Sequence, residues 1–261
     1  MIIKKSKWCD LIYGLVSVFF FIQAPIALAD QLRVAVASNF IFPLKELSRE
    51  FENTTGNEVL LISGSTGKLF AQIHQGAPFE VFLAADSNRP ELLEKDGIGV
   101  PGSRFTYAVG RLVMWSADPK FATKFGLHVL GQKFLRYLAI ANPKTAPYGK
   151  ATEQVLRKTG YWEKIQSRLV RGENISQTLQ FVVTGNAQIG FISLSQLNSS
   201  NGLLGGTSWL VPLNLHEPIQ QQAILLKRAN SNHVARAFLK FLKSKKGQKI
   251  IKTYGYYVEK F

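Results

Sequence analysis

The chain has 261 residues, of which 46% are hydrophobic and 19% charged, and its formal net charge at pH 7 is +15. This composition is that of a globular protein. Because the basic residues are scattered and no nucleic-acid recognition motif is present, the charge indicates a solvated basic surface and argues against nucleic acid or anionic lipid as partner.

The N-terminal segment has the features of a secretory signal peptide. Lysines precede an apolar run at residues 11–22, which is followed by Ala27-Leu28-Ala29. The run is too short to span a bilayer comfortably, so we expect a signal peptide at 1–29, a periplasmic mature protein and no stable membrane insertion after cleavage. Cleavage would remove 29 of the 261 residues and leave 232, without the only cysteine, Cys9. Loss of three lysines and one aspartate would lower the charge from +15 to +13.

Beyond the signal peptide, short β-type runs alternate with amphipathic helical segments. Strands are predicted at RVAVA, EVLLI and EVFLAA, followed by helices at residues 43–54, 67–74 and 90–95. Pro43 in the first turn of its helix and Gly56 after its end support these boundaries. The next run, FTYAVGRLVMWS, alternates poorly and is predicted to be a buried strand that crosses between two lobes.

The second half of the chain repeats this alternation. Strands are predicted at LAIAN, RLVRG and AQIGFIS, with helices at 147–158 and 175–184 and a short helix after the third strand. The run QQAILLK is predicted to be the last strand, before terminal helices at 232–243 and 245–254. This order predicts an α/β fold in which helices cover the faces of parallel sheets.

Two comparable α/β blocks predict two lobes. We expect a discontinuous first lobe of residues 30–108 plus 215–261, and a continuous second lobe of residues 109–214. Two apolar strands, at about 104–116 and 219–227, are expected to join them. Since open α/β sheets bind ligands beyond the carboxyl ends of their strands, a ligand cleft is predicted between the lobes.

The segment SGSTGK looks like a nucleotide-binding loop but lacks two of its parts. Ile62 stands where a Walker loop needs its first glycine, and Leu69 stands where it needs a hydroxyl that binds Mg²⁺. Both departures argue against ATP binding by this loop. What remains is a strand that leads into a Ser/Thr-capped helix, whose free N–H groups favour an anion of modest size.

Four strand-to-helix turns are rich in hydrogen-bond donors. The candidate donors are the hydroxyls of Ser38, Thr66 and Tyr148, the Asn39 amide, and the main-chain N–H groups of Asn39, Thr66 and Ile175. Three of the turns lack a carboxylate, and hydrogen phosphate would favour one as acceptor for its proton. The pattern thus favours an oxyanion without a proton at neutral pH, although each residue alone is also typical of a helix cap or a packing position.

Six segments together resemble the periplasmic molybdate-binding proteins of ABC importers. They are VAVASNF, SGSTGKLFAQIHQGAPFEVFLAAD, PGSRFTYAVGRLVMWS, IANPKTAPYG, EPIQQQAIL and YGYYV. The segments cover essentially the whole mature chain in the family's order, and the blocks at 76–86 and 142–149 are specific to it. The resemblance implies a two-lobed type II periplasmic-binding-protein fold, with two mixed sheets flanked by helices, that closes on molybdate or tungstate.

The resemblance also implies which residues contact the oxygens of the anion. Ser38, Asn39, Thr66, Tyr148 and Ile175 match the family's binding positions, as contacts to molybdate oxygens and not as direct metal ligands. Thr66 departs from a serine that is common there, which puts the size selectivity of the pocket in doubt. A tyrosine that many members carry in a strand-end motif is replaced here by Ser193 in GFIS, and Tyr148 implies the subgroup whose fourth hydroxyl comes from another turn.

The expected protein is a monomeric binding protein without a cofactor, whose partners are a small oxyanion and a membrane permease. Sulfate, phosphate or an organic anion remain alternative cargoes, because donor chemistry does not separate sulfate from molybdate. A secreted hydrolase is the alternative from another class. It is disfavoured because the sequence has neither a G-x-S-x-G elbow nor an H-E-x-x-H helix, and no mature cysteine. A sensory domain would need a separate output chain.

Overall fold

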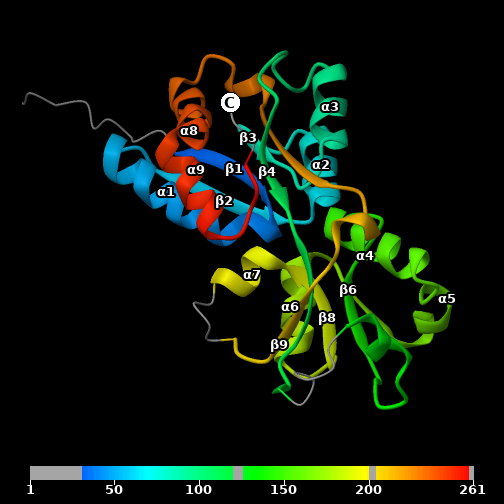
Figure 1. Cartoon of the computed structure of the whole chain (residues 1–261). Coiled ribbons are helices and arrows are strands. Elements are labelled where there is room, and N and C mark those ends of the chain that lie inside the picture. Colours follow the sequence, from blue (N-terminus) through cyan, green and yellow to red (C-terminus); the bar gives the residue numbers. More distant parts are fainter. Residues whose placement is uncertain (1–30, 120–125, 200–203, 259–261) are drawn as a thin grey trace, which may run out of the picture.

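Two five-stranded mixed sheets form the centres of two lobes in the computed structural model, which describes residues 31–119, 126–199 and 204–258 (Figure 1). The predicted signal peptide lies outside these residues. The strand order of the first sheet is β2 (Val59–Gly64), β1 (Leu32–Ala37), β3 (Val81–Leu83), β10 (Ile219–Leu225) and β4 (Phe105–Gly110). Its β1, β2 and β3 are parallel, and β10 is antiparallel to β3 and β4.

The second sheet has a similar plan. Its strand order is β7 (Leu169–Gly172), β6 (Leu138–Ala141), β8 (Ile189–Ser193), β5 (Leu112–Ser116) and β9 (Thr207–Leu210). Strand β6 is parallel to β7 and β8, whereas β5 is antiparallel to β8 and β9. The prediction of two mixed sheets flanked by helices is therefore confirmed.

Helices cover both sheets. The first lobe carries α1 (Ile41–Thr55), α2 (Thr66–His74), α3 (Asn88–Lys95), α8 (His233–Lys243) and α9 (Lys245–Thr253). The second carries α4 (Pro147–Lys158), α5 (Trp162–Ile165), α6 (Ile175–Val183) and α7 (Leu194–Ser199). Every long helix predicted from the sequence is present, with ends that differ by no more than two residues. Sequence reasoning missed α5 and β9, which are short, and β9 is an edge strand with alternate residues exposed.

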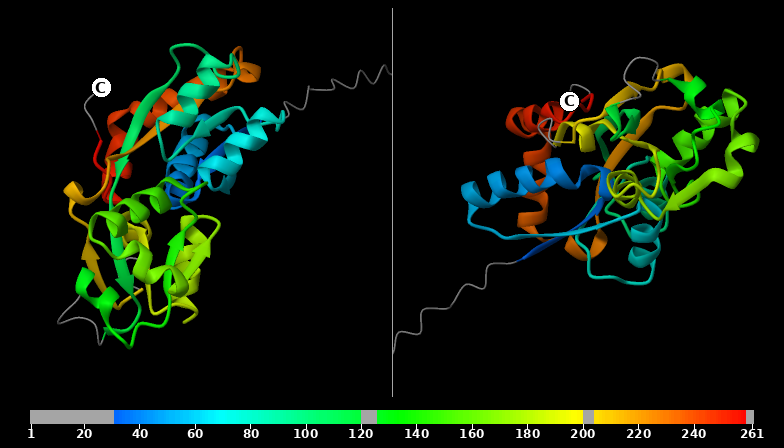
Figure 2. Two further views of the ribbon diagram at one scale, coloured as in Figure 1. Left: turned by 90° about the vertical axis from the view of Figure 1, so that its right-hand side faces the viewer. Right: turned by 90° about the horizontal axis from the view of Figure 1, so that it is seen from below.

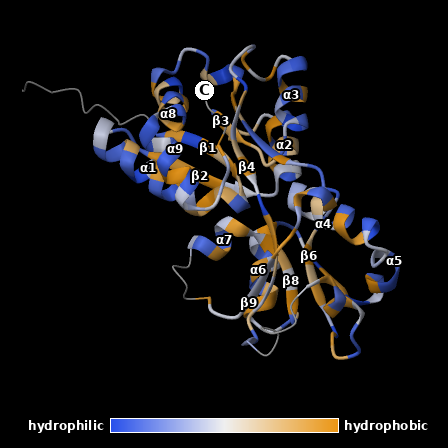
Figure 3. Ribbon diagram, viewed as in Figure 1, coloured by the Kyte–Doolittle hydropathy of each residue, from blue (hydrophilic) through white to orange (hydrophobic). Residues whose placement is uncertain are grey.

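Buried apolar clusters lie on both faces of each sheet, and the strands are rich in hydrophobic residues (Figure 3). In the first lobe, Phe40, Leu44 and Phe238 belong to the core on one face, and Leu69 and Phe82 to the core on the other. Such close packing makes each lobe a rigid support for the turns at its sheet edge.

The lobes are joined by two crossings of the chain. The run FTYAVGRLVMWS is two strands, β4 in the first sheet and β5 in the second, separated by Arg111 (Figure 2). The predicted second joining strand, 219–227, is placed differently: β10 belongs wholly to the first sheet, and the return is made by residues 211–218. A strand buried within one sheet and a strand that runs between two lobes have the same apolar sequence pattern. The sequence therefore did not show that 219–227 stays within the first sheet.

The return crossing contains a buried histidine, His216. Its Nδ1 donates to the carbonyl oxygen of Glu217 at 2.7 Å, and its Nε2 is buried without a partner among the described residues. Burial lowers the pKa of His216 below its usual 6.5. The hydrogen bond to the Glu217 carbonyl opposes this shift in part, and the Arg111 guanidinium adds a smaller lowering effect. The folded protein therefore favours the neutral ring.

This histidine should make stability depend on pH. As pH falls through about 6.5, the unfolded chain takes up a proton at His216 that the folded chain does not, so the unfolded state gains stability. We expect the free energy of unfolding to fall between pH 7.5 and pH 5.5, and His216→Gln to reduce that slope. Urea unfolding at pH 7.5 and pH 5.5 measures this change in the free energy of unfolding for the wild type and for the variant. An unchanged slope in His216→Gln would show that this ring does not contribute.

Candidate functional site

A small cavity of about 10 Å³ lies between the lobes. It is lined by Ala37, Ser38, Asn39, Gly64, Ser65, Thr66, Ala85, Ala146, Pro147, Tyr148, Asn174 and Ile175. All five residues that the sequence nominates are among them, and none of these twelve lining residues is charged. A wider hollow of about 160 Å³ adjoins the cavity and shares Ala85 and Pro147 with it.

Four helix starts meet at this cavity. A 3-10 turn over Ser38–Phe40 leads into α1, and Thr66, Pro147 and Ile175 are the first residues of α2, α4 and α6. The first N–H groups of a helix have no partner within the helix, and its start carries a partial positive charge. The cavity therefore offers donors and favourable dipoles to an anion without a charged side chain.

The start of α6 shows how the sequence leaves one of these donors free. The side chain of Asn174, the N-cap residue, accepts hydrogen bonds from the N–H groups of Ser176 at 3.0 Å and Gln177 at 3.1 Å. These bonds satisfy the second and third N–H groups of the helix. The first, that of Ile175, is not used by this cap, and Ile175 lines the cavity.

Thr66 lines the cavity with a hydroxyl that already accepts a hydrogen bond. Its Oγ1 accepts a hydrogen bond from the Ala85 N–H at 3.1 Å, and the side chain is fully buried. A hydroxyl that already accepts is free to donate its single proton. The next N–H of α2, that of Gly67, donates instead to the Thr145 carbonyl of the other lobe at 2.8 Å.

Tyr148 has the same arrangement on the second lobe. Its Oη accepts a hydrogen bond from Gln221 Nε2 at 3.3 Å. Burial raises the pKa of Tyr148 well above its usual 10.0, and the neighbouring Tyr256 and Tyr107 hydroxyls raise it further. The phenol is therefore a neutral donor throughout the physiological pH range.

Asn39 differs from the expectation that its side-chain amide faces the anion. Both protons of its Nδ2 are used, one toward Gln221 Oε1 at 2.8 Å and one toward Tyr256 Oη at 2.9 Å. The amide thus belongs to a buried network behind the cavity. The donor that Asn39 has left for a ligand is its main-chain N–H, near the start of a helical turn.

Two serines at the cavity have unused hydroxyls. The Ser38 carbonyl accepts from Ser176 Oγ at 3.3 Å, but its own hydroxyl has no partner within the described residues. Ser65 Oγ is buried and likewise unpartnered in the part of the chain that the structure describes. Sequence reasoning missed Ser65 as a site residue, because a serine before a helix is typically its cap. Here Ser65 is the N-cap residue of α2 but makes no side-chain cap hydrogen bond.

Two other residues of interest lie away from the cavity lining. Lys68 is more than half exposed and forms an ion pair with Glu173 of the other lobe at 2.5 Å. Ser193 is fully buried, and its hydroxyl contacts Ser195 Oγ at 2.9 Å and Gln196 Oε1 at 3.0 Å. Neither side chain lines the cavity.

A family model described as bacterial extracellular solute-binding protein matches residues 32–257. The chain belongs to this family. Among its curated relatives, the molybdate-binding protein ModA of Azotobacter vinelandii is 50% identical over 230 residues, 88% of this chain and 91% of the relative. ModA of Rhodobacter capsulatus is 46% identical over 233 residues, 89% of this chain and 90% of the relative. The resemblance found in the sequence is thereby confirmed.

Solved structures agree with the family and the fold. The periplasmic molybdate-binding protein of Azotobacter vinelandii superposes with a TM-score of 0.83 at 40% identity, covering 87% of this chain and 99% of that one. The sulfate-binding protein SubI of Mycobacterium tuberculosis has a TM-score of 0.68 at 12% identity, covering 87% of this chain and 86% of that one. At that identity the likeness to SubI shows the fold alone.

Both apolar and polar contacts join the lobes of this solute-binding protein. Ala37 and Ala85 of the first lobe share a buried apolar cluster with Tyr148 and Ile175 of the second. Besides the Gly67–Thr145 hydrogen bond and the Lys68–Glu173 ion pair, Ser195 Oγ donates to the Asn39 carbonyl at 2.8 Å. No helix in the described residues is long and apolar enough to cross a membrane.

Proposed function

We propose that this solute-binding protein captures molybdate or tungstate in the periplasm and delivers it to the membrane permease of an ABC importer. The observation that supports this most directly is a cavity lined by neutral donors at four helix starts, with no charged residue among its lining. The proposed contacts are the hydroxyls of Ser38, Thr66 and Tyr148 and the main-chain N–H groups of Asn39, Thr66 and Ile175. The two ModA relatives support the choice of anion.

Neutral donors suffice for tight binding of a dianion. A hydrogen bond to a charged group contributes about 1.5–3 kcal/mol, and association costs about 4–15 kcal/mol. Five or six such bonds, formed away from water, offset that cost and leave roughly micromolar affinity or better. In this proposal the ligand holds the lobes together, and they separate when it leaves.

The proposal includes three further statements. The lobes comprise residues 30–108 plus 215–261 and residues 109–214, the mature protein is monomeric, and it catalyses no reaction. The distribution of strands between the two sheets supports the first. Light scattering of the mature protein with and without ligand tests the second, and the absence of turnover of esters and phosphoesters tests the third.

Calorimetric titration of the mature protein with molybdate, tungstate, sulfate and phosphate tests the function. We expect the first two to bind with roughly micromolar or lower dissociation constants and the last two much more weakly. Sulfate binding that is as tight as molybdate binding would favour the alternative cargo. If neither molybdate nor tungstate binds below high micromolar concentration, the proposal is wrong.

Ser65→Ala should have opposite effects on stability and on binding. Because Ser65 Oγ is buried without a partner among the described residues, its removal relieves a desolvation cost in the free protein. If the hydroxyl donates to the anion, the same change weakens molybdate binding by about 1–3 kcal/mol. Melting temperature and calorimetry measure the two effects. Unchanged affinity would place Ser65 outside the ligand contacts. The control is Thr66→Ser, a substitution at the next residue that keeps a hydroxyl.

A further inference from the structure

A buried network of hydrogen bonds lies behind Tyr148, on the side away from the cavity. Its central residue is Gln221 of β10, which is fully buried and does not line the cavity. Gln221 Oε1 accepts from Asn39 Nδ2 at 2.8 Å and from Tyr107 Oη at 3.0 Å. Gln221 Nε2 donates to Tyr148 Oη at 3.3 Å. The network thus joins two ligand-site residues from different lobes.

The direction of these bonds follows from the Asn39 amide, whose nitrogen donates to Gln221 Oε1 and Tyr256 Oη. An amide nitrogen only donates, so Asn39 Nδ2 requires an oxygen opposite it, and the oxygen of the Gln221 amide takes that place. The nitrogen of the same amide must then face Tyr148. A phenol that accepts from an N–H directs its own proton elsewhere. For Tyr148 the two directions are the ligand cavity and the neighbouring Tyr256 hydroxyl, and a bound dianion is the stronger acceptor of the two.

The strand geometry holds Gln221 in this position. The register of β10 against β4 shifts between Gln221, opposite Ala108, and Gln222, opposite Thr106, so that Tyr107 is an extra residue in β4. Such a bulge re-aims side chains, and here the Tyr107 hydroxyl reaches Gln221. The extra residue is what brings Tyr107 and Gln221 together.

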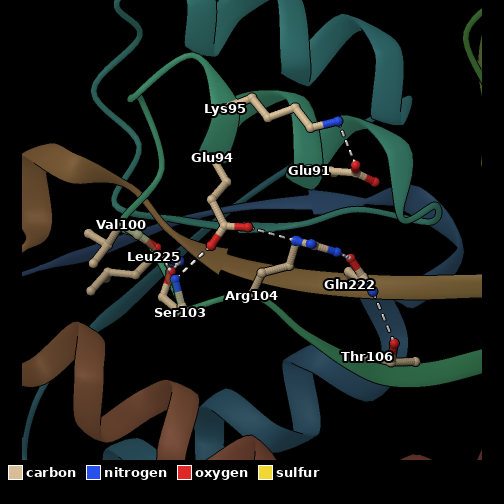
Figure 4. Close-up of polar contacts among 10 residues, drawn as sticks. Glu91, Glu94, Lys95, Val100, Ser103, Arg104, Thr106, Gln222 and Leu225 are labelled. Atoms are coloured by element: carbon tan, nitrogen blue, oxygen red, sulfur yellow. Dashed lines mark hydrogen bonds and ion pairs between the residues drawn. The ribbon is translucent and has the colours of Figure 1, made fainter.

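The neighbouring Gln222 is held by a separate set of polar contacts (Figure 4). Arg104 donates to Gln222 Oε1 at 2.8 Å and to Glu94 Oε2 at 3.0 Å, and Gln222 Nε2 donates to Thr106 Oγ1 at 3.2 Å. Glu94 in turn accepts from the Gly102 N–H at 2.6 Å. These bonds tie both strands to α3 and so resist a slip of the register that would turn Gln221 away from Tyr148.

We propose that Gln221 is a positioning residue that reserves the Tyr148 hydroxyl proton for the bound anion and so helps to select anions that carry no proton. This inference rests on the proposed function. With Thr66 oriented in the same way by the Ala85 N–H, both hydroxyls present only donors to the ligand. A deprotonated dianion matches these two donors, whereas the proton of hydrogen phosphate finds no acceptor at either of the two hydroxyls.

A double-mutant cycle with Tyr148→Phe tests the role of Gln221. Gln221→Met removes the amide at similar volume, and we expect it to weaken molybdate binding about 10-fold in the wild type but less than about 2-fold in Tyr148→Phe. Equal losses in the two backgrounds would overturn the proposal, because a merely structural role does not depend on the phenol. Gln220→Met makes the same chemical change on the exposed side of β10 and should leave the affinity unchanged.

A second readout is the ratio of affinities for molybdate and hydrogen phosphate. Without Gln221, the Tyr148 hydroxyl turns freely and can accept a hydrogen bond from the ligand as well as donate one. The preference for molybdate over hydrogen phosphate should therefore fall. An unchanged ratio in Gln221→Met would contradict this selectivity role. If that variant does not fold, Tyr107→Phe removes one of the two donors that orient the Gln221 amide, and its smaller loss should likewise vanish in Tyr148→Phe.

The two proposals fail in different ways. Sulfate binding in place of molybdate by the wild type would refute the proposed cargo, and the cycle measured with sulfate would still decide the role of Gln221. Tight molybdate binding with an additive cycle would refute only the role of Gln221. A wild type that binds no tetrahedral anion would refute both.

Discussion

Ile175→Pro is expected to weaken molybdate binding by about 10- to 100-fold, because it removes one hydrogen bond to a charged group. Helix α6 should stay intact. Proline lacks the N–H that Ile175 presents at the cavity, yet it suits the first position of a helix. The residue before a proline must be extended, and Asn174 already is, with φ of −144° and ψ of 175°. The substitution therefore removes a main-chain donor, which side-chain substitutions leave in place.

Calorimetry and circular dichroism together test this expectation. Ile175→Ala is the matched control, because it also removes the buried side chain but keeps the N–H. We expect the control to lose stability with little loss of affinity. If Ile175→Pro and Ile175→Ala bind molybdate equally well, the main-chain donor at this helix start does not contact the anion.

Gly110→Ala is also expected to weaken molybdate binding by about 10- to 100-fold, because the added methyl group causes a steric clash that costs roughly 1–3 kcal/mol. Gly110 is the last residue of β4, next to the first crossing between lobes. A Cβ at this position would lie 2.1 Å from Tyr148 Oη and 2.7 Å from Gln221 Nε2. The phenol would have to leave its place, and with it the donor it offers to the ligand.

A second glycine supplies the comparison for Gly110. A Cβ on Gly131 would meet only the Tyr161 ring, at 3.7 and 3.9 Å, which is ordinary contact. Gly131→Ala should therefore leave molybdate binding unchanged. Wild-type affinity in Gly110→Ala, with an unchanged melting temperature, would show that Tyr148 and the crossing strand accommodate the methyl group without loss of the site.

The sequence alone determined those features of this protein that depend on neighbours along the chain. Apolar periodicity and helix caps placed the main helices, because these patterns act within a few residues. Asn174 before α6 and Pro147 at the start of α4 are such local marks. Since parallel strands present their carboxyl ends at one sheet edge, the four donor-rich turns were also expected to meet, and all five nominated residues line one cavity.

Only the tertiary structure decided how each donor is used. Asn39 and Gln221 are 182 residues apart, and no local pattern shows that Gln221 takes up an amide proton of Asn39. The same holds for the bulge at Tyr107 and for the segment that returns between the lobes. Helices and turns follow from local propensity, but the direction of a buried hydrogen bond depends on every polar group that folding brings within reach, and that is decided by long-range packing.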